Sequence, residues 1–375
     1  MPNQYKFLII DTYYPKFLAS LDSKFSELAK KSYVDLRELI MDQCFGTSDF
    51  YSKNLKKLGC DAEEIIPNNS ILQRRWAIEH GMKLEKYFPT KITNKIPFLR
   101  KLTYKYNGSL KILESQIKTA KPDILYVQDI SFCPPDFLVA IKEYVKLVVG
   151  QIACPLPPLD YLEPYDLILT SFPHYVERFR KMGIRSEYFK IAFEPFVLEK
   201  VEPQERKYAC TFVGGISPAH KKATELLEKL ARNAEIDFFG YGVETLNKNS
   251  PIILRHHGEV WGLDMYRILL SSKITINRHI DVAENYANNM RLYESTGCGA
   301  MLITDHKENL NELFEVGKEV VVYRSIDELI NLIRYYSKNE KERLQIAENG
   351  QKRTLSEHTY HKRMVELVTI ISQYI

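Results

Sequence analysis

Ten short apolar runs, each followed by a polar or glycine-containing loop and then by a helical pattern, constrain the fold of this chain more than any other feature. The first five runs lie at 6–11, 61–66, 123–129, 146–151 and 166–171. The second five lie at 208–215, 235–242, 273–278, 300–305 and 319–323. Continuous apolar strands that alternate with helices are typical of parallel sheets covered on both faces. The pattern therefore predicts an α/β protein with two doubly wound, Rossmann-like domains.

The boundary between these domains is expected at 193–207, where prolines and charges interrupt the rhythm. A length of 375 residues also favours two cores over one. We expect an N-terminal domain over 1–200, a C-terminal domain over 205–356, and a last helix over 357–375 that packs back across the junction. Because open α/β sheets bind ligands beyond the carboxyl ends of their strands, the two sheets should face each other across a cleft lined by strand-end loops.

The overall composition is that of an ordinary globular protein, with 45% hydrophobic and 27% charged residues. The net charge of +4 is too small to indicate a nucleic-acid-binding protein. Residues 74–121 nevertheless hold twelve Lys or Arg against three Asp or Glu. Such an excess is typical either of a solvated helical surface or of a face that meets an anionic membrane or an anionic acceptor.

The cysteines and the N-terminus favour a cytoplasmic protein. Six cysteines stand far apart and form no CxxC pair, which favours reduced thiols over a disulfide framework or a zinc site. The start, MPNQYKFLIID, lacks the features of a signal peptide, and no apolar run approaches the ~20 residues of a membrane span. We expect membrane contact, if any, to be peripheral and to use residues 74–121.

The segment FVGGISPAHKKATELLEKL, at 212–230, has the pattern of a strand, a glycine loop and a helix with a basic first turn. Glycines allow close backbone approach, and free N–H groups at a helix start attract phosphate. A plain strand-to-helix turn is the alternative, because the segment has neither a GxxxxGK[ST] nor a GxGxxG pattern. The candidate phosphate-binding residues here are Gly214, Gly215, His220, Lys221 and Lys222.

Two further strand-end loops hold candidate ligand-binding residues. Gly240 lies in the first, and Val260 and Trp261 precede an amphipathic helix; the tryptophan would either stack on a base or sugar or serve as a hydrophobic anchor. Asn277 and Arg278 end an apolar run, and an arginine there pairs with a diphosphate better than a lysine does.

The stretch NNMRLYESTGCGAMLITD, at 288–305, is the most specific signal in the chain. Asn288 and Asn289 suit a helix N-terminus, and Asn288, Arg291 and Glu294 share one helix face, so they can converge on one ligand. Gly-Cys-Gly then ends the helix ahead of an apolar strand. The alternative is an Arg–Glu pair on an exposed face, which contributes little.

Several other chemistries find no support in the sequence. It contains no HExxH, no GxSxG, no paired-cysteine pattern and no DxD of the kind that holds a metal diphosphate. We therefore expect no metal and no cofactor other than a substrate nucleotide.

Three segments resemble glycosyltransferases of the GT-B fold, and most closely the CgeB-type, spore-maturation-protein-like group. They are CFGTSDFYSKNLKKLGCDAEEIIPNNSILQRRWA (44–77), NMRLYESTGCGAMLITDHKENLNELFEVGKEVVVYRSIDELINLIRYY (289–336) and ERLQIAENGQKRTLSEHTYHKRM (342–364). The resemblance covers most of the chain and is strongest over 256–363.

This resemblance implies transfer of a hexosyl or deoxyhexosyl group from a nucleotide-sugar donor to a glycan, lipid-linked or protein acceptor. The C-terminal domain would hold the donor, with Glu294 on the ribose, the two asparagines at the diphosphate and Arg291 on its charge. The family's second glutamate, eight residues earlier, is replaced here by Tyr286, which leaves the stereochemistry open.

Without a metal, the charge of the leaving group would be met by Lys221, Lys222 and Arg278 together with helix dipoles. Asp129 is the first candidate for a catalytic base, followed by Asp11 and His174. Two other functions remain open: a nucleotide-sugar epimerase or hydrolase on the same scaffold, and a non-catalytic nucleotide-sugar-binding assembly protein.

Overall fold

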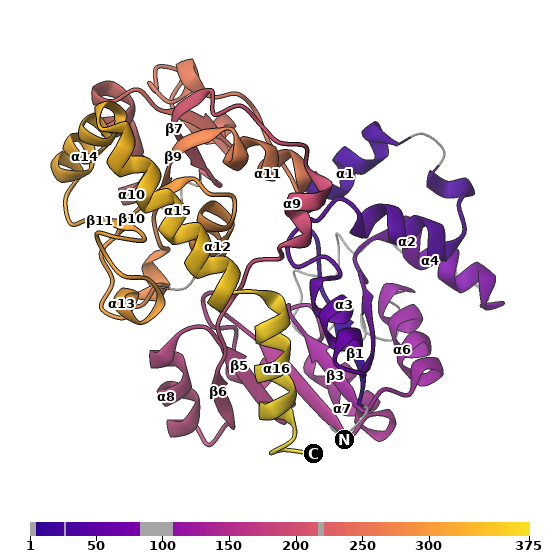
Figure 1. Ribbon diagram of the computed structural model, residues 1–375. Helices are drawn as coiled ribbons and strands as arrows, with labels where there is room; N and C mark the ends of the chain where they lie inside the picture. The colour runs from indigo at the N-terminus through magenta and orange to yellow at the C-terminus, as the bar shows by residue number, and fades with distance from the viewer. Residues whose placement is uncertain (1–4, 26–27, 83–107, 217–220, 288) are drawn as a thin grey trace. The chain divides into compact units, whose positions relative to one another are not determined.

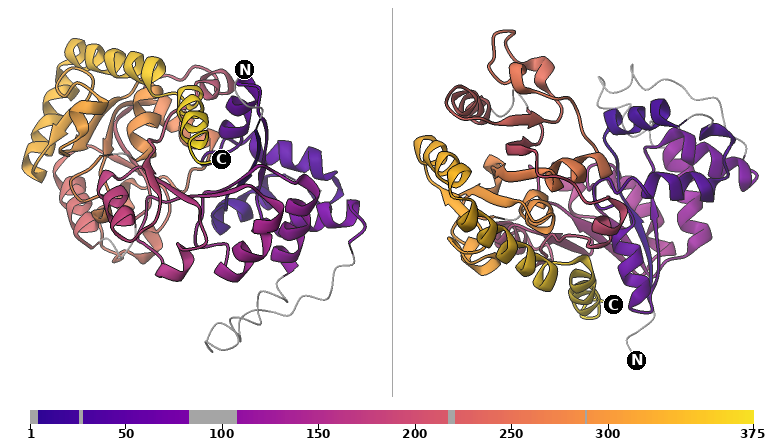
Figure 2. Two further views of the ribbon diagram at one scale, coloured as in Figure 1. Left: turned by 90° about the horizontal axis from the view of Figure 1, so that it is seen from below. Right: turned by 45° about the horizontal axis from the view of Figure 1, so that its top comes forward.

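The computed structural model describes residues 5–25, 28–82, 108–216, 221–287 and 289–375, except for the side chains of residues 22, 29 and 221–223. The chain forms two compact units: Met1–Phe189 with Met364–Ile375, and Lys190–Arg363. Each unit contains one parallel sheet, with helices on both of its faces (Figures 1 and 2). The two doubly wound α/β sheets expected from the sequence are thereby confirmed.

The first unit is built on a six-stranded sheet in the order β2-β1-β3-β4-β5-β6, in which every neighbouring pair is parallel. Its strands are β1 (Lys6–Ile10), β2 (Asp61–Ile65), β3 (Ile124–Val127), β4 (Leu147–Gln151), β5 (Leu167–Thr170) and β6 (Ser186–Tyr188). Its helices are α1 (Pro15–Lys24), α2 (Tyr33–Met41), α3 (Phe50–Lys57), α4 (Ser70–Glu79), α6 (Gly108–Ala120), α7 (Pro135–Ile141) and α8 (Pro173–Lys181). Short 3-10 turns lie at η1 (Leu28–Lys30), η4 (Lys142–Tyr144) and η5 (Leu159–Tyr161).

The second unit is built on a five-stranded sheet in the order β11-β10-β9-β7-β8, again parallel throughout. Its strands are β7 (Tyr208–Val213), β8 (Asp237–Phe239), β9 (Ser272–Asn277), β10 (Met301–Asp305) and β11 (Val321–Tyr323). Its helices are α9 (Phe196–Lys200), α10 (Lys221–Asn233), α11 (Leu263–Leu270), α12 (Met290–Gly297), α13 (Leu310–Leu313), α14 (Ile326–Lys338) and α15 (Glu340–Glu357). Short 3-10 turns lie at η7 (Val243–Thr245), η8 (Ile253–Arg255) and η9 (Asp281–Ala283).

The last helix, α16 (Tyr360–Ile371), begins in the second unit, and the residues from Met364 onward belong to the first. The polypeptide therefore returns to the first unit at its end. The division between the units falls after Phe189, upstream of the 193–207 segment in which the sequence prediction placed the boundary.

Alternation along β9 and β10 decides which side chains reach the core of the second unit. Ile274, Ile276, Met301 and Ile303 join one buried cluster with apolar residues of α10, α14 and α15. Because successive strand residues point to opposite faces, Asn277 and its neighbours on alternate positions face the other side of the sheet, where α11 and α12 pack.

Helix α14 shows how local sequence fixes an element of this unit. Ser325 caps it by accepting a hydrogen bond from the backbone N–H of Glu328 at 3.1 Å, and acidic residues in the first turn complement the helix dipole. Leu329, Ile330 and Ile333 are buried at helical spacing against the core.

Candidate functional site

Both sheets have a topological switch point, where the chain leaves the central strand in opposite directions. In the second unit this point lies between β7 and β9, and the loops that follow these strands begin at Gly214 and Arg278. In the first unit it lies between β1 and β3, followed by Asp11 and by Gln128 with Asp129. Ligands of open α/β sheets bind at such points, so these two edges are the candidate sites.

In the second unit, two asparagines at this edge hold each other. Asn289 caps α12 by accepting from the backbone N–H of Leu292. Its side-chain nitrogen donates to Asn277 Oδ1 at 2.9 Å, and Asn277 Nδ2 donates to Thr304 Oγ1 at 2.9 Å and to Asn289 Oδ1 at 3.3 Å. The predicted residues Asn277 and Asn289 are thus fixed side by side, with the start of α12 anchored to β9.

The Arg291–Glu294 pair lies one turn further along α12. Arg291 Nη1 is 2.9 Å from Glu294 Oε2 and also contacts the sulfur of Met265 at 3.2 Å. The hydroxyl of Tyr266, on α11, donates to Glu294 Oε1 at 3.5 Å. The ion pair is therefore formed, but not at an exposed face, since the Glu294 side chain is only 5% exposed.

Burial raises the pKa of Glu294 above its ordinary value, and the charge of Arg291 and the hydrogen bond from Tyr266 oppose that shift. A buried carboxylate needs several donors, because ionised Glu can accept about four hydrogen bonds. Arg291 and Tyr266 supply two, so the carboxylate keeps capacity for the hydroxyl groups of a ligand.

A histidine–aspartate pair at the same edge was not anticipated from the sequence. His279 Nδ1 lies 2.7 Å from Asp305 Oδ1, which also accepts from the backbone N–H of His279 at 3.0 Å. Burial acts to raise the pKa of Asp305, but the hydrogen bond and charge of His279 and the charge of Lys307 outweigh it and lower that pKa. Only their distance in sequence hid this pair, since His279 directly follows one apolar run and Asp305 ends another.

The glycines of the second unit serve the packing of two loops on each other. Gly240 has a φ of +130°, and a Cβ there would overlap the carbonyl oxygen of Gly214; a Cβ on Gly215 would overlap the ring of Tyr241. That ring stacks on Trp261 with centroids 5.5 Å apart and planes 14° apart. The structure thus gives Trp261 an aromatic partner within the protein, and Val260 beside it is half-buried.

Of the remaining predicted phosphate-binding residues, the structure describes the side chain of Arg278 but not those of the other four. Arg278 Nη2 lies 3.3 Å from Asp281 Oδ1, and its side chain is 21% exposed. His220 and Asn288 lie outside the described residues, and of Lys221 and Lys222 the structure describes only the backbone, at the start of α10.

At the switch point of the first unit, Asp11 and Asp129 lie close to two threonines. Thr12 Oγ1 donates to Asp129 Oδ2 at 2.6 Å, and Asp129 Oδ1 accepts from the backbone N–H of Ser131 at 3.1 Å. Thr47 Oγ1 lies 3.4 Å from Asp11 Oδ2 and 2.8 Å from Gln128 Oε1. Burial, with a smaller contribution from the charge of Asp129, raises the pKa of Asp11 to about 7.

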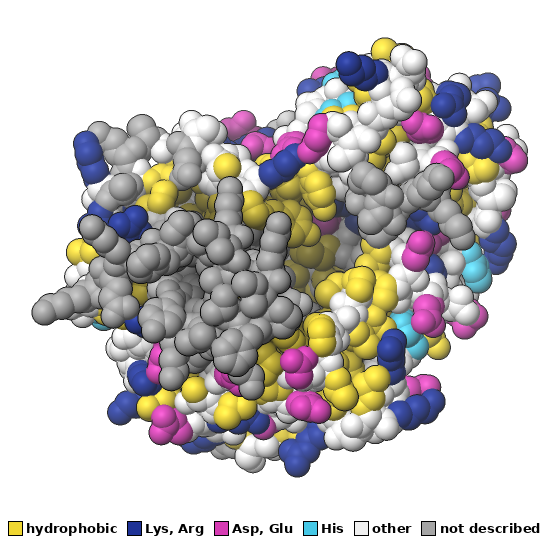
Figure 3. Space-filling view, turned by 180° about the vertical axis from the view of Figure 1, so that it is seen from behind, with side chains coloured by type: hydrophobic (Ala, Val, Ile, Leu, Met, Phe, Trp, Pro, Cys, Tyr) yellow, Lys and Arg dark blue, Asp and Glu magenta, His cyan; other side chains and the backbone are white. Residues whose placement is uncertain are grey.

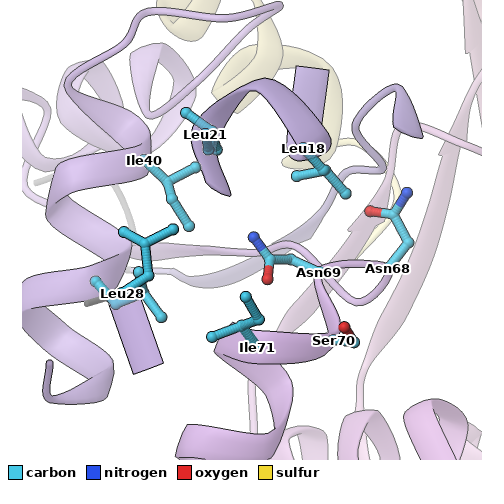
Figure 4. Close-up of a pocket in the computed structure, with 9 residues that line it drawn as sticks. Leu18, Leu21, Leu28, Ile40, Asn68, Asn69, Ser70 and Ile71 are labelled. Carbon is cyan, nitrogen blue, oxygen red and sulfur yellow. The ribbon is translucent and has the colours of Figure 1, made fainter. Parts of the chain in front are cut away.

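His174, the third candidate base, lies in the first turn of α8 and stacks on Phe172, with ring centroids 5.4 Å apart. The same unit has a pocket beyond β2, in which leucines of α1 and η1 and an isoleucine of α2 face Asn69 and Ile71 (Figure 4). The sequence offered no sign of this pocket, because its walls come from four separate elements.

The described part of the chain contains no cluster of His, Cys, Asp and Glu that could hold a metal ion. Nor does it contain a helix long and apolar enough to span a membrane. On the face shown in Figure 3, basic and acidic side chains are interspersed among the residues drawn in colour. Most of the basic segment 74–121 lies outside the described residues, so its predicted contact with an anionic surface stays a prediction.

Solved structures share the fold over nearly the whole chain at low sequence identity. Anabaena HepE in complex with UDP-glucose matches with a TM-score of 0.58 at 11% identity, covering 98% of this chain and 100% of that one. Sucrose-phosphate synthase of Thermosynechococcus elongatus matches with a TM-score of 0.59 at 9% identity, covering 98% of each chain. AviGT4, a glycosyltransferase involved in avilamycin A biosynthesis, matches with a TM-score of 0.58 at 12% identity, covering 99% of this chain and 98% of that one.

Sequence comparison gives a family for the second half of the chain. No curated protein matches the chain. Residues 221–369, which include Arg291, Glu294 and the β9–β11 edge, match the family described as glycosyl transferase-like. The resemblance to CgeB-type glycosyltransferases with the GT-B fold is thereby confirmed. That match covers less than half of the chain, and it shows which family this part of the chain is similar to.

Proposed function

We propose that the protein transfers a hexosyl or deoxyhexosyl group from a nucleotide-diphosphate-sugar to a glycan, lipid-linked or protein acceptor, and that the second unit holds the nucleotide. The observation that carries the proposal is the buried Arg291–Glu294 pair beside the switch point of the sheet. Removing two charges from water has a desolvation cost that their pairing often fails to recover in stability. Binding of a ligand to both charges would explain why they lie at this edge.

Each group at this edge has a distinct part in the proposal. Glu294 accepts hydrogen bonds from the ribose hydroxyls, and Arg291 meets the charge of the diphosphate. Asn289, with Asn288 before it, brings amide donors to the positive end of the α12 dipole. Asn277 acts through Asn289, whose amide it orients.

The loops after β7 and β8 complete the proposed donor site. Gly214, Gly215 and Gly240 bring backbone close to the phosphates, and the stacked Trp261 provides, with Val260, an apolar wall for the base. Lys221 and Lys222, at the start of α10, would contact the phosphates, together with His220, which precedes them in the sequence.

In this proposal, protein cations meet the charge that develops on the leaving diphosphate, and no metal is required. Arg291, Arg278 and the lysines of α10 act with the dipole of α12. Such groups accelerate the reaction because they bind the departing diphosphate more strongly than they bind the intact donor. UDP-glucose is the first donor to test, since HepE, which shares the fold, binds it.

The first experiment is a thermal-shift screen of the purified chain against UDP, GDP, dTDP, CMP and ADP. A nucleotide at 100 times its Kd should raise the free energy of unfolding by about 2.7 kcal/mol. For domains of this size we expect a shift of a few degrees in Tm. The same screen on Glu294→Gln, which keeps the side-chain shape, should show no shift.

The matched control is Glu340→Gln, which alters another Arg–Glu pair three residues apart, Arg343–Glu340 on α15. This variant should keep the nucleotide shift. If no nucleotide shifts the wild type, or if Glu294→Gln keeps the full shift, the proposed donor site is wrong. Binding without any turnover, with every acceptor tried, would instead favour a non-catalytic nucleotide-sugar-binding protein, and turnover of the donor alone would favour a hydrolase.

A further inference from the structure

We propose that the switch point of the first unit binds a hydroxyl group of the acceptor, with Asp11 as the base that takes its proton and Gln128 Nε2 as the donor that holds its oxygen. The inference rests on the proposed sugar transfer and specifies the acceptor group and the residues that bind it. It also makes Asp11 a better candidate for the catalytic base than Asp129, which was the first candidate from the sequence.

The two residues are brought together by the sheet itself. Ile10 on β1 pairs with Val127 on β3, and the ladder continues beyond the strands, where the N–H of Gln128 donates to the carbonyl of Ile10 at 2.9 Å. Asp11 and Gln128 therefore follow neighbouring strands at the same level, and both are partly exposed. This is the crevice in which such sheets bind ligands.

Hydrogen bonding at this edge is incomplete in a way that matches a hydroxyl group. Gln128 Oε1 accepts from Thr47, whereas Gln128 Nε2 is buried near the hydroxyl of Tyr51 and makes no well-formed hydrogen bond within the described part of the chain. Asp11 receives a hydrogen bond from the backbone N–H of Thr12 and only a long one from Thr47, at 3.4 Å. A hydroxyl both accepts and donates, so one such group satisfies the amide nitrogen and the carboxylate together.

Asp129 is less suited to the same role, because a short side-chain hydrogen bond already holds its carboxylate, whereas the only side-chain hydrogen bond to Asp11 in the described residues is long. Thr12 Oγ1 donates to one oxygen of Asp129 at 2.6 Å, and the N–H of Ser131 donates to the other at 3.1 Å. Its negative charge also contributes to the raised pKa of Asp11. The geometry therefore makes Asp129 a positioning residue, which fixes Thr12 and acts on Asp11 through its charge.

A second buried carboxyl in the same unit shows what a structural carboxyl looks like. Burial raises the pKa of Glu64 to about 7, as it does that of Asp11. Yet Glu64 accepts from the N–H of Ser52 at 2.8 Å, from Ser52 Oγ at 2.6 Å and from Arg37 at 3.3 Å. Glu64 is fully engaged within the protein, whereas Asp11 at the open end of its strand is not.

The loop that carries Thr47 is held in an uncommon backbone conformation. Cys44, Gly46 and Ser48 have φ values of +53°, +59° and +45°. Non-glycine residues with such values are uncommon and cluster at functional sites, where the surrounding structure enforces them. Ser48 Oγ donates to the carbonyl of Met41 at 2.6 Å, which helps to fix the turn that presents Thr47 to Asp11 and Gln128.

The chemical step conserves atoms and charge. The acceptor oxygen forms a bond to the anomeric carbon of the donor, and its proton passes to the carboxylate of Asp11. The bond between the anomeric carbon and the diphosphate oxygen breaks, and the nucleoside diphosphate leaves with the electron pair. A general base whose pKa lies near the working pH accelerates such a step by about 10²- to 10⁴-fold.

The test measures turnover of UDP-glucose, or of the glucose nucleotide that the binding screen selects. The acceptor hydroxyl is supplied by water or by a panel of methyl and nitrophenyl glycosides. Asp11→Asn should lower turnover about 100-fold or more and leave the thermal shift with UDP unchanged. Wild-type turnover should rise with pH through about 7, the pKa of Asp11, and the variant should lack that rise. Gln128→Met should raise KM for the glycosides more than it lowers kcat.

Glu64→Gln is the matched control, since it removes a carboxyl with a similarly raised pKa from the same unit. It should keep turnover and the rise with pH, with the rise moved to slightly lower pH because the charge of Glu64 contributes to the raised pKa of Asp11. Asp11→Asn turnover equal to that of the wild type would overturn the assignment. So would a wild type that binds the nucleotide but turns over no sugar nucleotide with water or any glycoside, while the donor site would stand. If no nucleotide binds, the proposed function fails first, and this inference fails with it.

Discussion

The switch points of the two sheets have the same topology but differ in how their carboxylates are held. In the second unit, Asn277 is paired with Asn289, Arg291 with Glu294, and His279 with Asp305 through Nδ1, while His279 Nε2 has no hydrogen-bond partner in the described residues. In the first unit, a carboxyl with a pKa of about 7 lies beside an amide nitrogen that makes no well-formed hydrogen bond in the described residues.

This difference fits a division of labour. Paired groups are rigid before the ligand arrives, which lowers the entropic cost of binding a donor. A carboxyl that can gain or lose a proton near neutral pH is suited to chemistry rather than to anchoring. One edge therefore has the properties of a preorganised binding site and the other those of a proton-transfer site.

The largest effect on stability should come from breaking the buried pair on α12. Glu294→Ala leaves Arg291, whose side chain is 17% exposed, without its partner. Loss of one member of a fully buried pair costs about 3–5 kcal/mol, so we expect a loss near the lower end of that range. Urea unfolding measures this loss. A loss below about 1 kcal/mol, the range of surface pairs, would mean that the α12 edge is neither buried nor rigid in solution.

The next largest effect is a difference between Asp11 and Glu64, the two buried carboxyls of the first unit, in how stability depends on pH. The folded chain keeps a proton on Asp11 up to about pH 7, whereas an unperturbed Asp loses it at 3.8, so unfolding releases a proton between these values. The free energy of unfolding should therefore fall as pH rises from about 4 to 7.

Asp11→Asn should remove its share of this fall and be more stable than the wild type at pH 8 by about 1–3 kcal/mol. One pKa unit corresponds to about 1.4 kcal/mol at most, and a partly exposed carboxyl contributes only a fraction. Glu64→Gln should instead be destabilised at pH 5, because it weakens hydrogen bonds from Ser52 and Arg37. Urea unfolding at pH 5 and 8 measures both changes in the free energy of unfolding. Equal changes in the two variants would mean that Asp11 and Glu64 do not differ in role.

A smaller effect is expected at the start of α12. Asn289→Ala removes the helix cap and the partner of Asn277, at a cost of about 1 kcal/mol. If this amide also meets the diphosphate, UDP affinity should fall while uridine affinity stays unchanged. An equal loss for both ligands would show that Asn289 acts on the fold alone.

The smallest effect concerns the basic segment 74–121, outside the comparison of the two edges. Co-sedimentation with vesicles should be stronger with acidic lipid than without it, and should weaken as salt rises. Equal co-sedimentation with both vesicles would leave the excess charge as a solvated surface.

Much of the fold could be predicted from the sequence, because fully buried strands leave a continuous apolar run. β3 and β5 are buried at every position, and their apolar runs predict them directly. β6 was missed, since Ser186–Tyr188 is a short polar edge strand that looks like a loop.

Contacts between candidate site residues could be predicted only where both residues lie within one helix. Spacing alone placed Arg291 near Glu294, but not the hydroxyl of Tyr266, which comes from α11. Thr47 and Gln128 stand 81 residues apart and meet only because a strained loop lies over the ends of two adjacent strands. Such contacts depend on topology and have no local signature.

The most direct test of the account is to measure the Kd for UDP and the turnover of UDP-glucose on the same preparations of wild type, Asp11→Asn and Glu294→Gln. The account predicts that Asp11→Asn keeps the wild-type Kd and loses turnover about 100-fold or more, while Glu294→Gln weakens UDP binding itself. If Asp11→Asn weakens UDP binding as much as Glu294→Gln does, or if neither variant differs from the wild type, then the two edges do not divide donor binding and proton transfer, and the account is wrong.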